Sequence, residues 1–310
     1  MQLDVVAAFF LMGAIAQVMK APVKMPKGLY QSLTIFLLIA IGLKGGIALE
    51  QHGSIALLYQ SLLIIGFGAL LPLIAFPLLL KFGGLSRVDS ASVAAHYGSV
   101  SIATFAVALA VLDAQGIAYE PYFPLFVALL EVPAIAVGLW LARGKDQSLD
   151  LKKVLHEIFF NQGVLLLVGA LLIGWWAGER SEKLMPFFGS LFHGVLALFL
   201  LEMGRVAASR INLLRQYGSF IASFGVVMPL IGATLGALCA MLLGLSVGGT
   251  ILLATLGGSA SYIAVPAAMA VALPSANQSV PITASLTVTF PFNVLVGIPL
   301  YSALITELLA

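Results

Sequence analysis

Two short polar segments, GSVS at 98–101 and GSAS at 258–261, interrupt strongly apolar stretches of this chain. Serine is a preferred helix N-cap, and glycine tolerates the backbone angles of a helix break. The start of a helix exposes unpaired N–H groups and about half a positive charge, which together favour an anion. We therefore predict a half-helix starting at 99–101 and another at 259–261, with their N-termini facing one small anion. The alternative is that Gly and Ser only allow close helix packing.

A single carboxylate, Glu131, lies in the apolar stretch ALLEVPAIAV, two residues before Pro133. An ionised carboxylate inside a bilayer costs several kcal/mol unless it is paired, and such residues usually mark ion or proton pathways. Glu131 is predicted to bind a coupling cation or to carry a proton. The alternative is a protonated or hydrogen-bonded acid with a structural role.

Other polar residues in apolar stretches are weaker candidates. Thr104 follows the first segment by one turn and offers a hydroxyl ligand, or bonds back to its own helix. Asn293 either assists in the other half or bonds between helices, and Tyr262 either donates its hydroxyl to a ligand or fills space. His96 is expected to be a packing residue, and Lys44 is expected to reach the interface from near its helix end.

The composition identifies the kind of protein that must position these residues. The chain is 61% hydrophobic and 9% charged, whereas about a quarter of the residues are charged in a soluble domain. Apolar runs near or above the roughly 20 residues that cross a bilayer recur along most of the length. The sequence predicts an all-α, polytopic membrane protein. Its one cysteine, Cys239, excludes an intrachain disulfide, and no basic cluster indicates nucleic acid.

Ten transmembrane spans are predicted, joined by short polar connectors that leave no room for a soluble domain. Their ranges are 3–19, 29–49, 55–80, 89–113, 120–142, 160–178, 184–204, 217–244, 247–273 and 280–309. The connectors on one side carry Lys20, Lys24, Lys27, Lys81, Arg87, Arg143, Lys145, Lys152, Lys153, Arg205, Arg210 and Arg215, and those on the other carry only Arg180 and Lys183. Because Lys/Arg-rich loops stay in the cytoplasm, both termini are predicted to face outside.

The ten spans divide into two sets of five around a polar segment. We predict a first five-helix repeat at 1–144, a short cytoplasmic linker at 145–159 and a second repeat at 160–310. An odd number of spans per repeat inserts the second repeat upside down, as in inverted-repeat secondary transporters. The two polar segments then occupy the fourth and ninth spans at matching depth, so the broken helices 4 and 9 are expected to cross at the midplane.

The chain resembles the sodium-dependent bicarbonate transporter family, best known from cyanobacteria. The residues that carry the resemblance are GLKGGIAL (42–49), GSVSIAT (98–104), ALAVLDAQGIAYE (108–120), EVPAI (131–135), GGSAS (257–261) and LPSANQS (273–279). The resemblance implies a gate or scaffold domain of helices 1, 2, 6 and 7, a mobile core of helices 3–5 and 8–10, elevator-like movement and a homotrimer. It places the anion at Gly98, Ser99, Ser101, Ser259, Ala260 and Ser261, with sodium near Glu131, Ser101 and Ser261.

This chain departs from the family pattern at several positions. Tyr262 stands where cyanobacterial members have an Asp, Glu131 stands for the family's Asp before the proline, and Ile102 and Ala103 replace smaller or hydroxyl-bearing residues. These changes touch the expected cation site most directly. Regulation by a PII-like partner, which the family suggests, is left open by the short linker.

Together these features predict a secondary transporter, not an enzyme, in a bacterial inner membrane. Sodium-coupled uptake of bicarbonate by alternating access is the leading prediction, with Glu131, Thr104, Tyr262 and Asn293 as candidate cation-coupling residues. The alternatives are proton- or sodium-coupled transport of another small anion or carboxylate, and an anion channel on the same fold. No cofactor is expected beyond a coupling sodium ion, and lipid is the expected surrounding partner.

Overall fold

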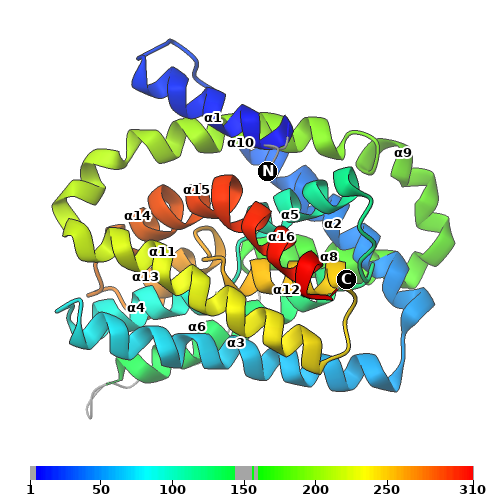
Figure 1. The fold of residues 1–310 in the computed structure, drawn as a ribbon. Coiled ribbons are helices and arrows are strands. Elements are labelled where there is room, and N and C mark those ends of the chain that lie inside the picture. Colours follow the sequence, from blue (N-terminus) through cyan, green and yellow to red (C-terminus); the bar gives the residue numbers. More distant parts are fainter. Residues whose placement is uncertain (1–4, 144–155, 157–159, 310) are drawn as a thin grey trace.

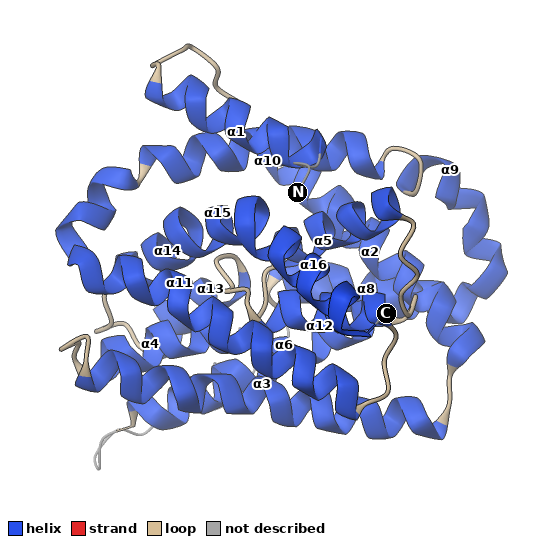
Figure 2. Ribbon diagram, in the orientation of Figure 1, coloured by secondary structure: helices blue, strands red, loops and turns tan. Residues whose placement is uncertain are grey.

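The protein is helical throughout the residues described in its computed structural model, which are 5–143, 156 and 160–309 (Figures 1 and 2). The first part of the chain forms α1 (Val5–Val18), α2 (Lys27–His52), α3 (Ile55–Lys81), α4 (Arg87–Gly98), α5 (Ile102–Gln115) and α6 (Phe123–Ala142). Each of the first five predicted spans therefore has a helical counterpart within a few residues. The predicted linker at 145–159, with Lys145, Lys152 and Lys153, lies outside the described residues except at position 156.

The second part of the chain forms more and shorter helical segments than the first part. It forms α8 (Gln162–Ala177), a 3-10 turn η1 (Gly178–Leu184), α9 (Met185–Phe188), α10 (Phe192–Ser209), α11 (Ile211–Leu242), α12 (Val247–Gly257) and α13 (Ala264–Ala272). The last helical run joins α14 (Ser279–Thr283), a π-helical segment η2 (Ala284–Thr289), α15 (Phe290–Phe292), a second π-helical segment η3 (Asn293–Gly297) and α16 (Ile298–Leu309).

Two predicted boundaries in this second part are wrong. The seventh span was expected from residue 184, but α10 begins at Phe192, because residues 178–188 first form η1 and α9. The expected connector 205–216 is largely helical, since α10 runs to Ser209 and α11 starts at Ile211. The change of direction comes instead at Gly218, whose φ of 79° places it in the region that glycine favours.

Seven helical segments are long and apolar enough to cross a membrane, among the residues described. They are Lys27–His52, Ile55–Lys81, Arg87–Gln115, Phe123–Ala142, Gln162–Phe188, Tyr217–Leu242 and Ser279–Leu309. Two more apolar helices, Val5–Val18 and Val247–Gly257, are shorter. The protein is thus a polytopic helical membrane protein, and the full count of ten spans stays a prediction.

The helices pack in two groups. In one, α1 lies against α10 and α2 lies against α8; in the other, α3, α4 and α6 pack together, and α11 packs on α12 (Figure 1). The span made of α4 and α5 is the most enclosed, with 94% of its apolar window buried, against 39–56% for the other six. Thus the first of the two polar segments lies in the innermost helix of the protein.

Glycines make the two closest crossings of the first group. Gly13 of α1 and Gly204 of α10 lie directly against each other's helix backbone, so that a Cβ on either would overlap a carbonyl oxygen, of Leu201 and of Phe10 respectively. Gly46 of α2 and Gly174 of α8 form a second crossing of the same kind. Small residues allow such close approach between membrane helices.

Candidate functional site

Both predicted helix breaks are present. In the first, α4 ends at Gly98 and α5 begins at Ile102. Ser101 caps α5, because its Oγ accepts a hydrogen bond from the Thr104 N–H at 3.1 Å. Gly98 lies so close to the ring of Pro72 in α3 that a Cβ would overlap it. The glycine therefore permits close packing of α3, and the serine begins the new helix.

The second break is longer than the sequence predicted. α12 ends at Gly257, and α13 begins at Ala264 rather than at 259–261. Ser259 does not cap α13, since its Oγ donates to the Leu256 carbonyl of the preceding helix at 2.8 Å. The Ser261 hydroxyl is a weak cap at best, since the Val265 N–H lies 3.5 Å from its Oγ. Residues 258–263 are thus an extended crossing segment between the two half-helices.

The two breaks hydrogen-bond to each other, although they are about 160 residues apart in the chain. The Ser101 N–H donates to Ser259 Oγ at 3.0 Å, and the Ser261 N–H donates to the His96 carbonyl at 2.8 Å. All four residues are at most 4% exposed. Backbone groups freed by each break are therefore satisfied by the other, as backbone polar groups in a membrane interior require.

A small cavity lies where the two half-helices begin. It is lined by residues 100–103 from the start of α5 and 261–264 from the start of α13, and Glu131 of α6 also reaches it. The first group of helices closes the other side with Thr34, Leu37, Leu38, Gly163 and Phe199. Its free volume of about 30 Å³ holds a few water-sized groups. The starts of two helices therefore line one small, partly open space.

Glu131 is the one carboxylate that lines this cavity. It is 1% exposed, and Ser99 Oγ donates a hydrogen bond to its Oε2 at 2.6 Å. Pro133 lies in the same helix, where a proline frees a backbone carbonyl one turn earlier. In the described part of the chain, no cluster of three or more His, Cys, Asp or Glu side chains surrounds it. A cation bound here would have serine and backbone oxygens as its further ligands.

The structure brings only some of the predicted site residues to the cavity. Ser101, Ser261, Glu131 and Tyr262 line it, and Ser99 contacts it through Glu131. The others are buried behind its wall: Gly98, Ser259, Ala260, Thr104 and Asn293. Tyr262 packs edge-on against Phe290, with ring centroids 5.5 Å apart.

Asn293 supports the second break from the last helical run. Its Nδ2 donates to the Gly258 carbonyl at 2.7 Å, and its Oδ1 accepts from the Tyr301 hydroxyl at 3.2 Å. It begins the π-helical segment η3, a conformation often found at functional sites.

Thr104, unlike Asn293, has no hydrogen-bond partner for its buried side-chain oxygen, Oγ1. Since Thr104 does not line the cavity, its predicted part in cation coupling stays a prediction.

Sequence reasoning missed a second group of supporting polar residues. The Tyr97 hydroxyl and Thr289 Oγ1 are 2.7 Å apart, and Thr289 also donates to the Gly225 carbonyl at 2.7 Å. These contacts tie α4 and η2 to α11 just beside the first break. Only the presence of a hydroxyl in an apolar helix signals such residues, and that signal does not reveal a partner almost 200 positions away.

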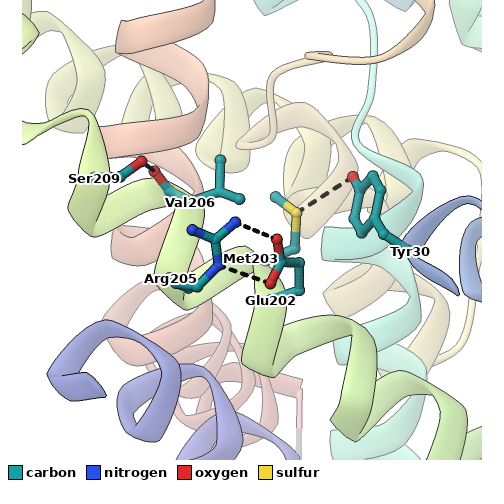
Figure 3. Close-up of polar contacts among 6 residues, drawn as sticks. All are labelled: Tyr30, Glu202, Met203, Arg205, Val206 and Ser209. Atoms are coloured by element: carbon teal, nitrogen blue, oxygen red, sulfur yellow. Dashed lines mark hydrogen bonds and ion pairs between the residues drawn. The ribbon is translucent and has the colours of Figure 1, made fainter. Parts of the chain in front are cut away.

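His96 and the Glu202–Arg205 pair lie next to the site without lining it. His96 is fully buried, and its Nδ1 is 2.8 Å from the Ser92 carbonyl. Arg205 Nε donates to Glu202 Oε2 at 2.9 Å, one turn apart on α10 (Figure 3). Beside them the Tyr30 hydroxyl donates to Met203 Sδ at 3.5 Å (Figure 3). The Tyr30 ring also stacks on Phe199 of the cavity wall.

Comparison with known families agrees with this arrangement. The family model described as the Na+-dependent bicarbonate transporter superfamily matches residues 5–306, nearly the whole chain. The chain belongs to this superfamily. The resemblance found in the sequence motifs is thereby confirmed. No curated protein matches the chain.

Membership places this superfamily protein among membrane transporters rather than enzymes. The match covers both breaks, Glu131 and the supporting residues around them. The four positions at which this chain is expected to depart from the family's motifs all line the cavity: Ile102, Ala103, Glu131 and Tyr262.

Proposed function

We propose that this protein is a secondary transporter that takes up a small anion with sodium, and that bicarbonate is the anion. The observation that supports it most is the convergence of two helix N-termini, those of α5 and α13, on one small cavity. Each contributes about half a positive charge, together with first-turn N–H groups that the hydrogen bonds between the two breaks do not occupy. No Lys or Arg lines the cavity, so these backbone groups and the serine hydroxyls supply the attraction for the anion.

Coupling follows from the charge of the same site. An unaccompanied anion is costly to move through a region of low dielectric. Glu131 adds a negative charge within the cavity and so favours a cation beside the anion. Sodium is a hard cation that takes oxygen ligands, and Ser101 and Ser261 line the same space. We infer that anion and sodium bind together and that their opposite charges allow the loaded site to move.

The glycine crossings support an inverted-repeat arrangement of the two halves, 1–144 and 160–310. If α1 corresponds to α8 and α2 corresponds to α10, Gly13 matches Gly174 and Gly46 matches Gly204. The same correspondence turns the Gly13–Gly204 crossing into the Gly174–Gly46 crossing. These separations, 161 and 158 residues, nearly equal the 160 between the two polar segments. A pseudo-two-fold relation between two five-helix repeats explains all three.

The packing also supports a division into two moving bodies. α1, α2, α8 and α10 would form the scaffold, and the remaining helices would form the core that carries both breaks. The cavity lies between them, since Thr34, Leu37, Leu38 and Phe199 come from the scaffold side. Alternating access would then occur as the core slides along the scaffold. The homotrimer and a PII-like regulator stay predictions.

The proposed orientation follows from charge. The regions 20–27, 81–87 and 205–215 carry eight of the twelve described Lys and Arg residues, and the 178–191 region carries only two. By the positive-inside rule the first set is cytoplasmic, so both termini face outside. In a bacterium this membrane would be the inner one.

The function is tested by uptake of labelled bicarbonate into proteoliposomes that contain the purified protein. We expect rapid uptake with an inward sodium gradient and little uptake with potassium instead. Equal uptake with either cation would contradict sodium coupling. Uptake of another small anion in preference to bicarbonate would contradict the assigned substrate.

Proton coupling is the second candidate, and one observation favours it. Glu131 is the only carboxylate that lines the cavity, and its one hydrogen-bond partner among the described side chains is Ser99. A single carboxyl group is enough to carry a proton, whereas sodium needs several oxygen ligands. Bicarbonate uptake driven by an inward proton gradient in sodium-free buffer distinguishes proton coupling from sodium coupling. Uptake under this condition would support proton coupling.

A further inference from the structure

A second, larger cleft opens between the two groups of helices, at the opposite end of α5 from the break. Its free volume is about 490 Å³. Ile41 and Lys44 of α2 form one wall, Leu109 and Asp113 of α5 form another, and Phe192 of α10 and Pro124 of α6 complete it. This space, the α2–α5 cleft, is separate from the cavity at the breaks.

Lys44 is the unusual residue of the α2–α5 cleft. It is exposed, although its neighbours from position 40 to 46 are buried. Its ammonium lies 5.9 Å from the centre of the Phe192 ring, a cation–π contact that holds it toward the cleft. The expectation that Lys44 reaches the interface from its helix end is not met, because α2 continues for eight more residues to His52.

Asp113, the other charged side chain that lines the cleft, already has polar contacts of its own. Asp113 Oδ1 accepts a hydrogen bond from the Tyr119 hydroxyl at 3.1 Å, and Asp113 Oδ2 lies 3.9 Å from His193 Nε2. Among the residues that the structure describes, no acidic side chain lies within ion-pair distance of Lys44. Lys44 therefore has no ion-pair partner among the described residues, whereas the Asp113 carboxylate in another wall of the cleft has its own contacts.

The cleft and the cavity follow the same seam between scaffold and core. On α2, Leu37 and Leu38 line the cavity, and Ile41 and Lys44 line the cleft on the following turns. Six residues from Leu38 to Lys44 correspond to about 9 Å along the helix axis. On α5, residues 102 and 103 line the cavity, and Leu109 and Asp113 line the cleft.

We propose that the α2–α5 cleft is an anion-recruitment site in which Lys44 binds the small anion before it reaches the cavity at the breaks. This inference rests on the proposed function. In the orientation inferred above the cleft faces outside, where the substrate arrives. A positive charge without an ion-pair partner, in a cleft with largely apolar walls, raises the local concentration of an anionic substrate. Lys44 thus supplies the formal positive charge that the cavity itself lacks.

The first test compares Lys44→Gln with Lys44→Arg in the proteoliposome assay. Lys44→Gln should raise the bicarbonate concentration for half-maximal uptake about fivefold with little change in the maximal rate, and Lys44→Arg should preserve both. Lys27→Gln, which removes an exposed lysine at the other end of the same helix, is the matched control. An unchanged half-maximal concentration in Lys44→Gln, or an equal change in Lys27→Gln, would overturn the proposal.

The second test needs no transport, so it separates this inference from the proposed function. The purified wild-type protein is treated with a sulfonated succinimidyl ester, and labelling of each lysine is followed by mass spectrometry. Sodium bicarbonate, compared with gluconate at equal ionic strength, should slow the labelling of Lys44 but not that of Lys183, which is exposed in η1. No protection, or equal protection of both lysines, would contradict an anion site at Lys44. Protection without any bicarbonate uptake would instead leave the site standing and contradict the proposed function.

Discussion

Glu131 shows how one residue constrains the chemistry of the site. A carboxylate that is 1% exposed, with a single serine hydroxyl as its hydrogen-bond partner, is expensive as a permanent charge. It is tolerated if a cation or proton accompanies it for part of the transport cycle. Its place beside two helix N-termini joins the binding of that cation to the binding of the anion.

Replacing Glu131 by Gln should therefore abolish gradient-driven uptake and leave the protein folded. The amide keeps the size and can still accept the bond from Ser99, but it carries no charge and no titratable proton. Labelled bicarbonate uptake and thermal unfolding of the purified protein measure the two effects. Glu50→Gln, an exposed acid near the end of α2, should behave like the wild type. Undiminished uptake in Glu131→Gln would remove Glu131 from the mechanism.

Ser259 carries a second prediction at the residue scale. Its hydroxyl accepts the Ser101 N–H at 3.0 Å, and this bond joins the two breaks. Ser259→Ala leaves that buried N–H unpaired, which costs about 1–3 kcal/mol. We expect the variant to unfold at a temperature a few degrees lower and to bind the anion more weakly. Ser209→Ala, which removes an exposed serine hydroxyl bonded to the Val206 carbonyl (Figure 3), is the control; an equal shift in both variants would contradict a special role for Ser259.

At the scale of elements, the helix ends and crossings determine where the site lies. α4 and α12 stop at glycines, and the half-helices that follow start beside one another because the two breaks exchange backbone hydrogen bonds. The scaffold is held by the crossings at Gly13–Gly204 and Gly46–Gly174. Close backbone contact at these points packs α1 on α10 and α2 on α8, the helices of the proposed scaffold.

Gly204→Ala should disrupt the α1–α10 crossing. The added Cβ would overlap the Phe10 carbonyl oxygen, and overpacking of this kind costs about 1–3 kcal/mol. The variant should show a lower unfolding temperature or a lower yield of monodisperse protein on size-exclusion chromatography. Gly66→Ala in α3 meets nothing within 4 Å, so it should be neutral or slightly stabilising, because alanine favours a helix. A wild-type unfolding temperature in Gly204→Ala would show that the two helices separate easily.

At the scale of the whole molecule, two bodies share a boundary that contains both the cavity and the α2–α5 cleft. The boundary follows α2 and α10 on one side and α5 and α13 on the other. In the mechanism we propose, sliding along this boundary would change which of its ends is open while the breaks stay intact. The binding geometry would then stay rigid during the movement that transports the ion.

The orientation of the whole molecule is tested by surface labelling. In a Cys239→Ser background, the variant Glu179→Cys should react with a membrane-impermeant maleimide on intact cells. Lys24→Cys should react only after the membrane is permeabilised, because its loop is on the Lys/Arg-rich side. Both positions are exposed, so a difference in reactivity reports sidedness. The reverse pattern would invert the topology and place the α2–α5 cleft in the cytoplasm.

Local sequence patterns were sufficient for the helical fold and for the existence of both breaks. Apolar runs require helices in a bilayer, and a Gly–Ser segment inside such a run marks an interruption. The sequence also singled out Glu131, which lines the cavity in the structure, and its part in coupling stays a prediction. The start of α13 was misplaced, because Ser259 bonds across the breaks to Ser101 rather than capping its own helix.

What the sequence by itself determined is therefore the type of each element and the residues that are out of place in a membrane. Only the tertiary structure decided which of them meet: Ser99 with Glu131, Asn293 with Gly258, and Lys44 with the α2–α5 cleft. The physical reason is that hydropathy and capping act within a few residues, whereas these contacts join helices far apart in the chain. Their geometry depends on how close the glycine crossings allow the helices to approach.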